Sequence, residues 1–457
     1  MGNAHPTIVL GVGFTIVAFK VGLLGLGTVG TGTVQVLLDR AGRHPLLQEL
    51  EVYRVGVRSQ NKTRAVKLPD HILTTDLKAI VTDPKIDIVV EVLGGLEPAR
   101  SLILQAIKHG KHVVTANKAV IARYGDEIFT AANSAGVYVL LEAAVGGGIP
   151  VILPLKQSLS VNRIHSVTGI VNGTTNYILT RMQSEGSAFN DVLADAQKLG
   201  YAEADPTADV DGLDAADKIA ILASLAFGGR IKLADIYCEG IRSISKTDIT
   251  YAQKLGFVIK LLAIANRNTS SSLSVRVHPT LVPSSHPLSN VNGVSNAILV
   301  EGEPLGQVMF FGPGAGAGAT ASAVVADILN IAAMLKTRNF KHQEVTPSPH
   351  PSSLIPHPLL ACSHQDYYAI APMEELVTRF YARFLTQDSP GVIGKLGTCF
   401  GNHGVSLESV VQTGIKQELA EIVVVTHDVQ EGNFRSSLAE IRELEAIHSI
   451  PSLLRVL

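Results

Sequence analysis

Short apolar runs alternate with segments of helical periodicity over the first third of the chain. The runs that predict strands are Val21–Leu24, Glu51–Val57, Ile86–Leu93, His112–Ala116 and Val137–Leu141. Segments of helical length, such as Pro98–Lys108 and Lys118–Ala135, lie between them. Strands that alternate with helices form a parallel sheet covered on both faces. We therefore predict a doubly wound α/β domain over residues 20–150.

The pattern changes over residues 151–309. Helical stretches at Asn190–Leu199, Asp214–Phe227 and Thr250–Ala265 are mixed with an alternating run at Leu273–His278. This mixture predicts an α+β domain. The Gly-rich stretch FFGPGAGAGATASAVVADIL then leads into a helix at about 320–335, and we expect residues 310–340 to complete the first domain.

Closely spaced prolines in residues 341–366 prevent regular structure and predict a linker. The segments after it read strand, helix, strand, strand, helix, strand: Leu376–Leu385, Pro390–His403, Val405–Gln412, Glu421–Thr426, Asn433–Leu444 and Ser452–Leu457. That order predicts a ferredoxin-like βαββαβ module over residues 367–457.

The composition is that of a globular protein of several domains. The chain has 457 residues, 46% hydrophobic and 17% charged, and a net charge of −2, so no basic field points to a nucleic-acid partner. Its three Cys are too few and too widely spaced for a disulfide framework, and we expect free, mostly buried thiols in a reducing cytoplasm. The apolar segment Thr7–Phe19 is too short for a membrane span and lacks a basic flank, so we interpret residues 1–19 as an N-terminal extension without membrane association.

The stretch VGLLGLGTVGTG places Gly25, Gly27 and Gly30 in GxGxxG spacing, directly after a predicted strand and at the start of a helix. In that context the first Gly permits a tight turn, the second a close approach of pyrophosphate, and the third helix–strand packing. This predicts a dinucleotide site on a Rossmann-type sheet. The alternative is a Gly-rich turn without a ligand.

The end of the second strand bears on the choice of cofactor. An NAD site usually has an Asp or Glu there, whereas VGVRSQNKTR supplies Arg58, Lys62 and Arg64. Positive charge suits a 2′-phosphate and favours NADP(H) over NAD(H). A solvated basic loop is the alternative.

An acidic stretch, LGYAEADPTADVDGLDAADK, closes with Asp214 and Lys218 four residues apart on one helical face. A calcium loop is excluded, because the ligand two residues after Asp211 and the closing Glu are both missing. An exposed salt bridge of little energetic value is one interpretation, and the wall of a substrate site is the other. We expect Asp205, Asp211 and Asp217 to be solvated.

Five motifs occur in one order: VGLLGLGTVG, ANK, EAAVGGGIP, GIVNGTTNYI and the acidic stretch. Together they closely resemble homoserine dehydrogenase over residues 20 to about 340. The segment TQDSPGVIGKLGTCFGNHGVSLESV resembles an ACT domain, an amino-acid-sensing fold. The resemblance implies NADPH-dependent, reversible reduction of L-aspartate 4-semialdehyde to L-homoserine in threonine, methionine and isoleucine biosynthesis. It also implies a middle domain that binds substrate and forms homodimers or larger homo-oligomers.

The family's site residues carry over to this chain. Lys218 matches the proton donor, Lys118 would lie between nicotinamide and substrate, and Asp214 would orient the Lys218 ammonium. The substrate-binding set is Glu203, Asp209, Asp214, Gly173 and Thr174. The cofactor-binding set is Gly25, Gly27, Thr28, Val29, Gly30, Arg58, Lys62, Gly94, Lys118, Gly314 and Gly316. A Lys ammonium suits this chemistry because it stabilises the developing alkoxide and supplies its proton.

The resemblance further implies a monovalent cation, sodium, held by the Glu142 side chain and the backbone carbonyls of Val145, Gly147 and Ile149. Oxygen ligands suit a hard cation. The alternative is a tight turn in which Glu142 accepts interdomain hydrogen bonds.

In the C-terminal module the resemblance implies a threonine effector at the turn formed by Asp388, Pro390 and Gly391, with Asn402 and His403 at the end of the helix. A dimerisation module without a ligand is the alternative there.

Two rival functions remain for the whole chain. Another amino-acid-pathway reductase with a nucleophilic Cys would depend on Cys238, and a non-catalytic amino-acid sensor would not need the intact lysines.

Overall fold

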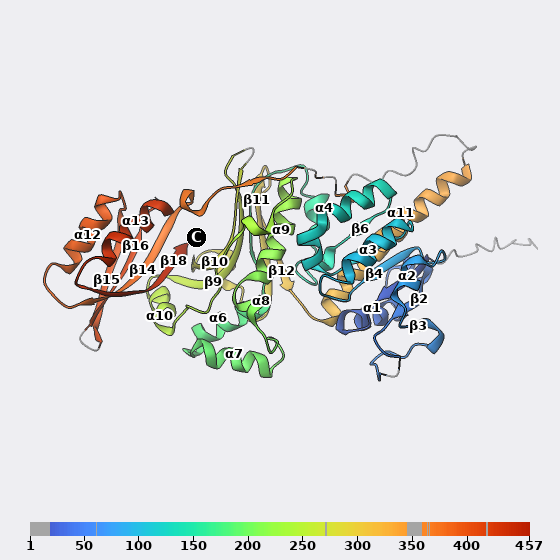
Figure 1. Ribbon diagram of the computed structural model, residues 1–457, viewed down its shortest axis with the longest axis horizontal. Helices are drawn as coiled ribbons and strands as arrows, with labels where there is room; N and C mark the ends of the chain where they lie inside the picture. The colour runs from blue at the N-terminus through green and yellow to red at the C-terminus, as the bar shows by residue number, and fades with distance from the viewer. Residues whose placement is uncertain are drawn as a thin grey trace, which may run out of the picture.

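The computed structural model describes residues 19–60, 62–269, 272–344, 359–362, 364, 366–416 and 419–457. Three domains lie in a row, with the dinucleotide-type domain at one end, the mixed domain in the middle and the C-terminal module at the other end (Figure 1). The extension predicted at residues 1–19 lies outside the described residues except for Phe19, which begins the first strand. Residues 345–358, the larger part of the predicted linker, also lie outside them.

The first domain is a six-stranded parallel sheet in the order β3-β2-β1-β4-β5-β6. Its strands are β1 (Phe19–Leu24), β2 (Leu50–Gly56), β3 (Leu73–Thr74), β4 (Ile88–Glu91), β5 (His112–Thr115) and β6 (Val139–Leu140). The helices between them are α1 (Thr28–Leu38), α2 (Leu77–Thr82), α3 (Ala99–Lys108) and α4 (Lys118–Ala135). Val21, Val89 and Val113 are fully buried, as expected for strands covered on both faces. The predicted doubly wound sheet is confirmed.

One long helix, α11 (Ala317–Glu344), returns from the middle domain to the first sheet and packs along α1. A Cβ on Gly32 of α1 would lie 2.7 Å from the Ala317 carbonyl oxygen, so glycine permits this close approach. The helix runs beyond the predicted end at 335 and into the first residues assigned to the linker. Among the described residues it is also the one helix long and apolar enough to cross a membrane, but half of that apolar window is buried in the protein, as in a core helix.

The middle domain is built on an antiparallel sheet in the order β12-β11-β7-β9-β10. Its strands are β7 (Arg163–Ile170), β9 (Phe257–Arg267), β10 (Ser272–Pro283), β11 (Ser295–Glu303) and β12 (Gly306–Pro313), with the two-residue β8 (Tyr237–Cys238) beside β10. Its helices are α5 (Ile152–Lys156), α6 (Gly173–Glu185), α7 (Phe189–Lys198), α8 (Thr207–Val210), α9 (Leu213–Phe227) and α10 (Lys246–Lys254). The expected α+β character is therefore present.

The helix predicted at Thr250–Ala265 is wrong over most of its length. Helix α10 ends at Lys254, and Gly256 has a φ of +81°, a left-handed conformation that glycine adopts without strain. The apolar run that follows is the strand β9, which pairs with β7 and β10. Burial on both faces removed the period-two alternation, so periodicity alone could not distinguish this strand from a helix.

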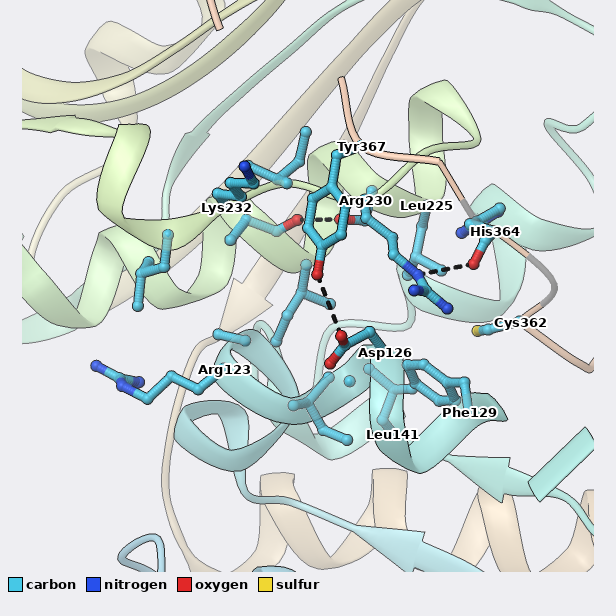
Figure 2. Close-up of a pocket in the computed structure, with 18 of the residues that line it drawn as sticks. Arg123, Asp126, Phe129, Leu141, Leu225, Arg230, Lys232, Cys362, His364 and Tyr367 are labelled. Atoms are coloured by element: carbon cyan, nitrogen blue, oxygen red, sulfur yellow. Dashed lines mark hydrogen bonds between the residues drawn. The ribbon is translucent and has the colours of Figure 1, made fainter. Parts of the chain in front are cut away.

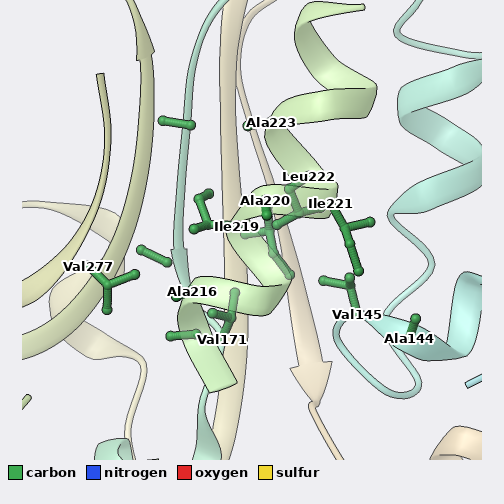
Figure 3. Packing of buried hydrophobic residues seen from close by; sticks show 14 of the residues in the cluster. Ala144, Val145, Val171, Ala216, Ile219, Ala220, Ile221, Leu222, Ala223 and Val277 are labelled. Atoms are coloured by element: carbon green, nitrogen blue, oxygen red, sulfur yellow. The ribbon is translucent and has the colours of Figure 1, made fainter. Parts of the chain in front are cut away.

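Helix α9 lies at the centre of the molecule. Its residues Ala216, Ile219 and Leu222 pack among buried side chains that come from the middle sheet and from the turn after β6, such as Val277 and Val145 (Figure 3). Both sides of α9 are therefore covered, one by the middle sheet and the other by the turn after β6.

The C-terminal module has the predicted βαββαβ order: β14 (Val377–Gln387), α12 (Val392–Asn402), β15 (Leu407–Lys416), β16 (Leu419–Thr426), α13 (Glu431–Arg442) and β18 (Ile447–Val456), with short strands β13 (Ala369–Ile370) and β17 (Val429–Gln430). Its strand order is β18-β14-β16-β15, as in a ferredoxin-like fold. The sheet also continues into the middle domain, because β18 pairs with β10 in parallel at Thr280–Arg455 and Leu281–Val456. The sequence did not reveal this continuity.

Buried ion pairs join the module to the middle domain. Arg383 of β14 donates to Asp248 of α10 at 2.8 Å, and both side chains are almost fully buried. Arg455 of β18 bonds Glu431 within the module and Glu239 of the middle domain at 3.1 Å. Buried pairs of this kind fix how two surfaces meet, because a displaced partner would leave an uncompensated charge.

Candidate active site and nucleotide cleft

A cavity of about 940 Å³ opens beside the Gly-rich turn. Its lining includes Gly25, Gly27 and Thr28 of the turn, Arg58 and Lys62 after β2, and Ala317 at the start of α11. The volume lies near the upper end of the range of about 300–1,000 Å³ for ligand sites. The tertiary structure thus brings the two segments predicted for the dinucleotide to one cavity.

Each of the three glycines in the turn occupies a position that favours glycine for a different geometric reason. Gly25 has a φ of +111°, and a Cβ on Gly27 would meet nothing within 4 Å, so the backbone at Gly27 stands open to a ligand. A Cβ on Gly30 would lie 2.3 Å from the carbonyl oxygen of Gly25. Val29 lies in the first turn of α1. The amide end of this 11-residue helix therefore faces the place where a phosphate would approach.

The basic residues after β2 divide into two roles. Arg58 and Lys62 are exposed at the cavity, and neither is in a salt bridge within the described residues. Arg64 instead donates to the carbonyl oxygens of Gln60, Lys62 and Ser59 and so holds the loop in shape. Arg58 and Lys62 are therefore the side chains free to meet an anionic group.

Two ammonium groups meet one carboxylate at the first turn of α9. Lys218 Nζ donates to Asp214 Oδ2 at 2.6 Å and to the Val171 carbonyl at 2.6 Å. Lys118 Nζ, from the first residue of α4, lies 2.9 Å from Asp214 Oδ1. The side chains of Asp214 and Lys218 are 9% and 11% exposed, so the interpretation as an exposed helical salt bridge is wrong.

The electrostatics of this cluster keep Asp214 and Lys118 charged. Burial raises the pKa of Asp214, but the charges of Lys218 and Lys118 outweigh it and hold that pKa well below its usual range. Burial lowers the pKa of Lys118, but Asp214, followed by Asp217 and Asp209, reverses the shift, so the pKa is raised. At neutral pH a cationic amine is therefore held at the junction of the first two domains.

Asn172 connects the acidic stretch to this centre, and sequence reasoning missed it. Its amide donates to Asp209 at 2.7 Å and to Asp214 at 2.9 Å, and its side-chain oxygen caps α6 through Thr175 N. Burial, followed by the neighbouring Asp214, raises the pKa of Asp209 despite the Asn172 hydrogen bond. The available signal was an Asn directly before a helix in GIVNGTTNYI.

The remaining predicted substrate residues border the same region. Thr174 donates its hydroxyl to the Tyr201 carbonyl at 2.7 Å and ties the acidic loop to α6. A Cβ on Gly173 would lie 2.8 Å from the Val294 carbonyl oxygen, so glycine permits that close packing. Glu203 is exposed on the loop, with its backbone carbonyl bound by Gln197.

The expectation that the other acidic residues are solvated is correct for Asp205 and wrong for Asp217. Asp205 is exposed, whereas Asp211 pairs with Arg242 at the surface. Asp217 is 6% exposed and pairs with Arg123 of α4 at 2.9 Å. Asp217 lies on the α9 face that contacts α4, so it forms a second link between the two helices.

The turn after β6 carries the predicted cation ligands. Glu142 accepts the backbone N–H groups of Val151, Ile152 and Leu153, and burial raises its pKa. The buried carbonyl oxygens of Val145, Gly147 and Ile149 accept no hydrogen bond from the residues that the structure describes. One Glu142 oxygen receives a single donor, so these groups retain the capacity to bind a cation.

Gly314 has a packing reason to be glycine. A Cβ there would lie 2.0 Å from the buried Asn296 amide, and a Cβ on Gly147 would lie 2.4 Å from the Gly314 carbonyl oxygen. Gly316, with a φ of +115°, precedes α11. Neither Gly314 nor Gly316 lines the nucleotide cavity among the described residues, whereas Ala317 does.

A buried carboxylate at the end of β4 also escaped sequence reasoning. Glu91 accepts the Thr115 hydroxyl at 2.6 Å and the Leu93 amide at 2.8 Å, and burial raises its pKa. It thereby fixes the ends of β4 and β5 beside Lys118. Gly94, with a φ of +78°, belongs to the same turn, but Leu93 rather than Gly94 lines the nucleotide cavity.

A smaller cavity of about 280 Å³ lies at the turn between β14 and α12. Asp388 and Gly391 line it together with Gln412 of β15. Pro390 lies between those two turn residues. Asn402 and His403 do not line this cavity and instead bond Glu440 of α13. Of the residues predicted to bind the effector, only those of the turn lie together at this cavity.

The three cysteines are free thiols, two of them buried. Burial raises the pKa of Cys238 to about 11. A thiol that stays protonated is a poor nucleophile, so the rival function that depends on Cys238 loses its support.

Sequence and structure comparisons agree on one family. The homoserine dehydrogenase family model matches residues 150–329, the model of its NAD-binding domain matches residues 25–142, and an ACT domain model matches residues 380–446. A homoserine dehydrogenase from Synechocystis sp. is 66% identical over 96% of this chain and 99% of its own length. One from Bacillus subtilis is 41% identical over 96% of this chain and 98% of its own length. The crystal structure of a homoserine dehydrogenase from Thiobacillus denitrificans is 42% identical, with a TM-score of 0.86 over 96% of this chain and 98% of that one.

Proposed function

The chain belongs to the homoserine dehydrogenase family, an NAD(P)-dependent oxidoreductase family acting on CH–OH groups, and from that premise we propose how its own residues carry out the reaction. The substrate pair is L-aspartate 4-semialdehyde and L-homoserine. The observation that carries the proposal is the meeting of Lys118, Lys218 and Asp214 at the junction of the nucleotide and middle domains.

The nicotinamide cofactor supplies or accepts the hydride. As the aldehyde carbon receives it, the carbonyl oxygen develops negative charge and needs a proton. Lys218 donates that proton, and the Lys118 ammonium stabilises the charge. Asp214 holds both amines by its two oxygens, 2.9 Å from Lys118 and 2.6 Å from Lys218, and thereby orients them.

Asp209 and Glu203 provide negative charge for the substrate's α-ammonium group. Asp209 is fixed by Asn172, whereas Glu203 is exposed on the acidic loop. The first-turn amides of Gly173 and Thr174 accommodate the α-carboxylate, since a helix N-terminus favours an anion. With the ammonium and carboxylate groups on the α-carbon held in this way, the aldehyde at the other end of the substrate is directed toward the lysines.

Replacing Lys218 tests the proton donor. Lys218→Ala is expected to lower kcat for homoserine oxidation by about 10²- to 10⁴-fold with a smaller change in KM, the typical contribution of a general acid or base. Lys198→Ala, which removes an exposed lysine of α7, is the matched control. Near wild-type turnover of Lys218→Ala would remove Lys218 from this role.

The cofactor proposed is NADP(H), because Arg58 and Lys62 are cations at the nucleotide cavity without a salt bridge to any residue that the structure describes, and no carboxylate follows β2 in the sequence. One of the similar structures is an archaeal homoserine dehydrogenase in complex with NADPH, 28% identical with a TM-score of 0.59. Arg58→Gln is expected to raise the KM for NADP at least 10-fold and leave that for NAD within twofold. An equal change for both cofactors would contradict recognition of the 2′-phosphate by Arg58.

We also propose a sodium ion at the turn after β6, held by Glu142 and the carbonyl oxygens of Val145, Gly147 and Ile149. Those buried carbonyl groups would gain the partners they lack. Sodium titration of the enzyme in a potassium-free and sodium-free buffer is expected to raise its melting temperature. An unchanged melting temperature would favour the tight-turn interpretation.

The C-terminal module is proposed to bind threonine at the cavity beside Asp388 and Gly391, which can take the ammonium and carboxylate groups of an amino acid. Feedback inhibition of the pathway would follow from the link between β10 and β18.

We further propose a homodimer formed through the middle domain. Inhibition assays with threonine, repeated with Asp388→Asn, and light scattering test these two proposals separately.

A further inference from the structure

A third cavity lies away from the reaction centre. This cavity, of about 360 Å³, is bounded by α4, by α9 and by Cys362, His364 and Tyr367 from the stretch before the C-terminal module (Figure 2). Among the described residues, its lining includes none of Lys118, Asp214 and Lys218. Its volume is within the range of about 300–1,000 Å³ for small-molecule sites.

The walls are largely apolar where the two helices face each other. Phe129 of α4 and Ile221 and Leu225 of α9 contribute to the lining. Helix α4 departs from helical geometry at Tyr124, with a φ of −126°, and Gly125, which has no side chain, lines the cavity at that point. The kink in α4 thus coincides with one wall of the cavity.

The polar groups at the cavity have an excess of positive charge. Arg230 donates to the His364 carbonyl at 2.9 Å and to the Thr130 hydroxyl at 3.2 Å, and Lys232 is exposed beside the Tyr367 ring. Neither Arg230 nor Lys232 pairs with a carboxylate in the part of the chain that the structure describes.

The one carboxylate that the described residues contribute to the cavity lining, that of Asp126, already accepts a hydrogen bond. Asp126 accepts the Tyr367 hydroxyl at 3.2 Å, as Figure 2 shows. Arg123, the third cation of the lining, is neutralised by Asp217. The cavity therefore offers two cations without a carboxylate partner among the described residues, against the one lining carboxylate of Asp126, and an apolar surface. This combination matches an anion with an apolar body.

We propose that this cavity is a binding site for a small amphipathic carboxylate. Arg230 and Lys232 hold the carboxylate group, and Phe129, Ile221 and Leu225 contact the apolar body. Such a ligand binds at the same time as substrate and cofactor, because it contacts α4 and α9 beyond their first turns, where Lys118 and Asp214 lie.

Calorimetric titration of the full-length enzyme with 4-phenylbutyrate tests the proposal. We expect one site per chain, at least 10-fold tighter for the carboxylate than for 4-phenylbutanamide or 4-phenylbutylamine. Binding is expected to persist in the presence of homoserine and NADP. Absence of saturable binding, equal affinity for the three probes, or displacement by homoserine or NADP would overturn the proposal.

Variants locate the site. Lys232→Gln is expected to weaken binding at least threefold, and Ser224→Leu, which fills the cavity from α9, to abolish it. Lys85→Gln, at an exposed lysine between α2 and β4, is the control for loss of a positive charge. Arg230→Gln is expected to weaken binding 10-fold, and Lys232→Gln keeps the test decisive if loss of Arg230 prevents folding. Unchanged affinity in both Lys232→Gln and Ser224→Leu would refute this location.

Discussion

Replacement of Asp214 by Asn gives the sharpest test of the two-lysine centre. The substitution keeps the shape of the side chain and removes the charge shared by Lys118 and Lys218. In the native enzyme, burial lowers the pKa of Lys118 and the carboxylates reverse that shift. Without Asp214 the effect of burial is largely uncompensated, so the pKa of Lys118 must fall.

The size of that fall follows from Coulomb's law. Two unit charges 2.9 Å apart interact by about 1.4 kcal/mol at a dielectric constant of 80 and about 6 kcal/mol at 20. These energies correspond to roughly 1 and 4 pKa units. The Lys118 side chain is 38% exposed, so solvent screening favours the lower part of this range, and we expect a fall of about 1–2 units.

The assay is the pH dependence of kcat/KM for reduction of L-aspartate 4-semialdehyde. The Lys118 ammonium is needed to stabilise the developing charge in this direction, so activity declines as the pH rises through the pKa of Lys118. Asp214→Asn is expected to move that alkaline limb about 1–2 pH units lower and to reduce the maximal rate about 10²-fold.

Asp211→Asn is the matched control, because Asp211 precedes the same helix but pairs with Arg242. Its alkaline limb should coincide with that of the native enzyme. If Asp214→Asn also kept the native alkaline limb and rate, the charge of Asp214 would have no role in holding Lys118 protonated, and the reasoning would be refuted.

Two further changes test the packing that supports the site. Gly30→Ala would place a Cβ 2.3 Å from the Gly25 carbonyl oxygen and is expected to cost about 1–3 kcal/mol of unfolding free energy. Gly27→Ala, with open space at its Cβ, should keep the native melting temperature and only weaken cofactor binding. Equal melting temperatures of the two variants in calorimetry would contradict this expectation. Arg383→Met leaves the buried Asp248 without its cation and is expected to lower the free energy of unfolding by about 3–5 kcal/mol. Adding Asp248→Asn to this variant should recover most of the loss. Denaturant unfolding that shows no recovery would exclude a simple pairing effect.

Features that depend on neighbours along the chain could be predicted from the sequence. Gly25 and Gly30 are five residues apart and meet within one turn, and Asp214 and Lys218 meet because a helix places residues four apart on one face. The order of strands and helices was likewise sufficient for the Rossmann-type sheet and the βαββαβ module. These features arise from local backbone geometry, which periodicity and glycine spacing record directly.

Which distant groups meet depends on long-range packing, and the folded structure was needed to see it. It brought Lys118 to Asp214 across 96 positions, and it joined β18 to β10, which share no sequence signal for pairing. It also showed that Asp217 is buried and that the run after Gly256 is a strand. The physical reason is that a buried charge or an apolar run takes its role from the partners that long-range packing supplies, and local patterns carry no record of those partners.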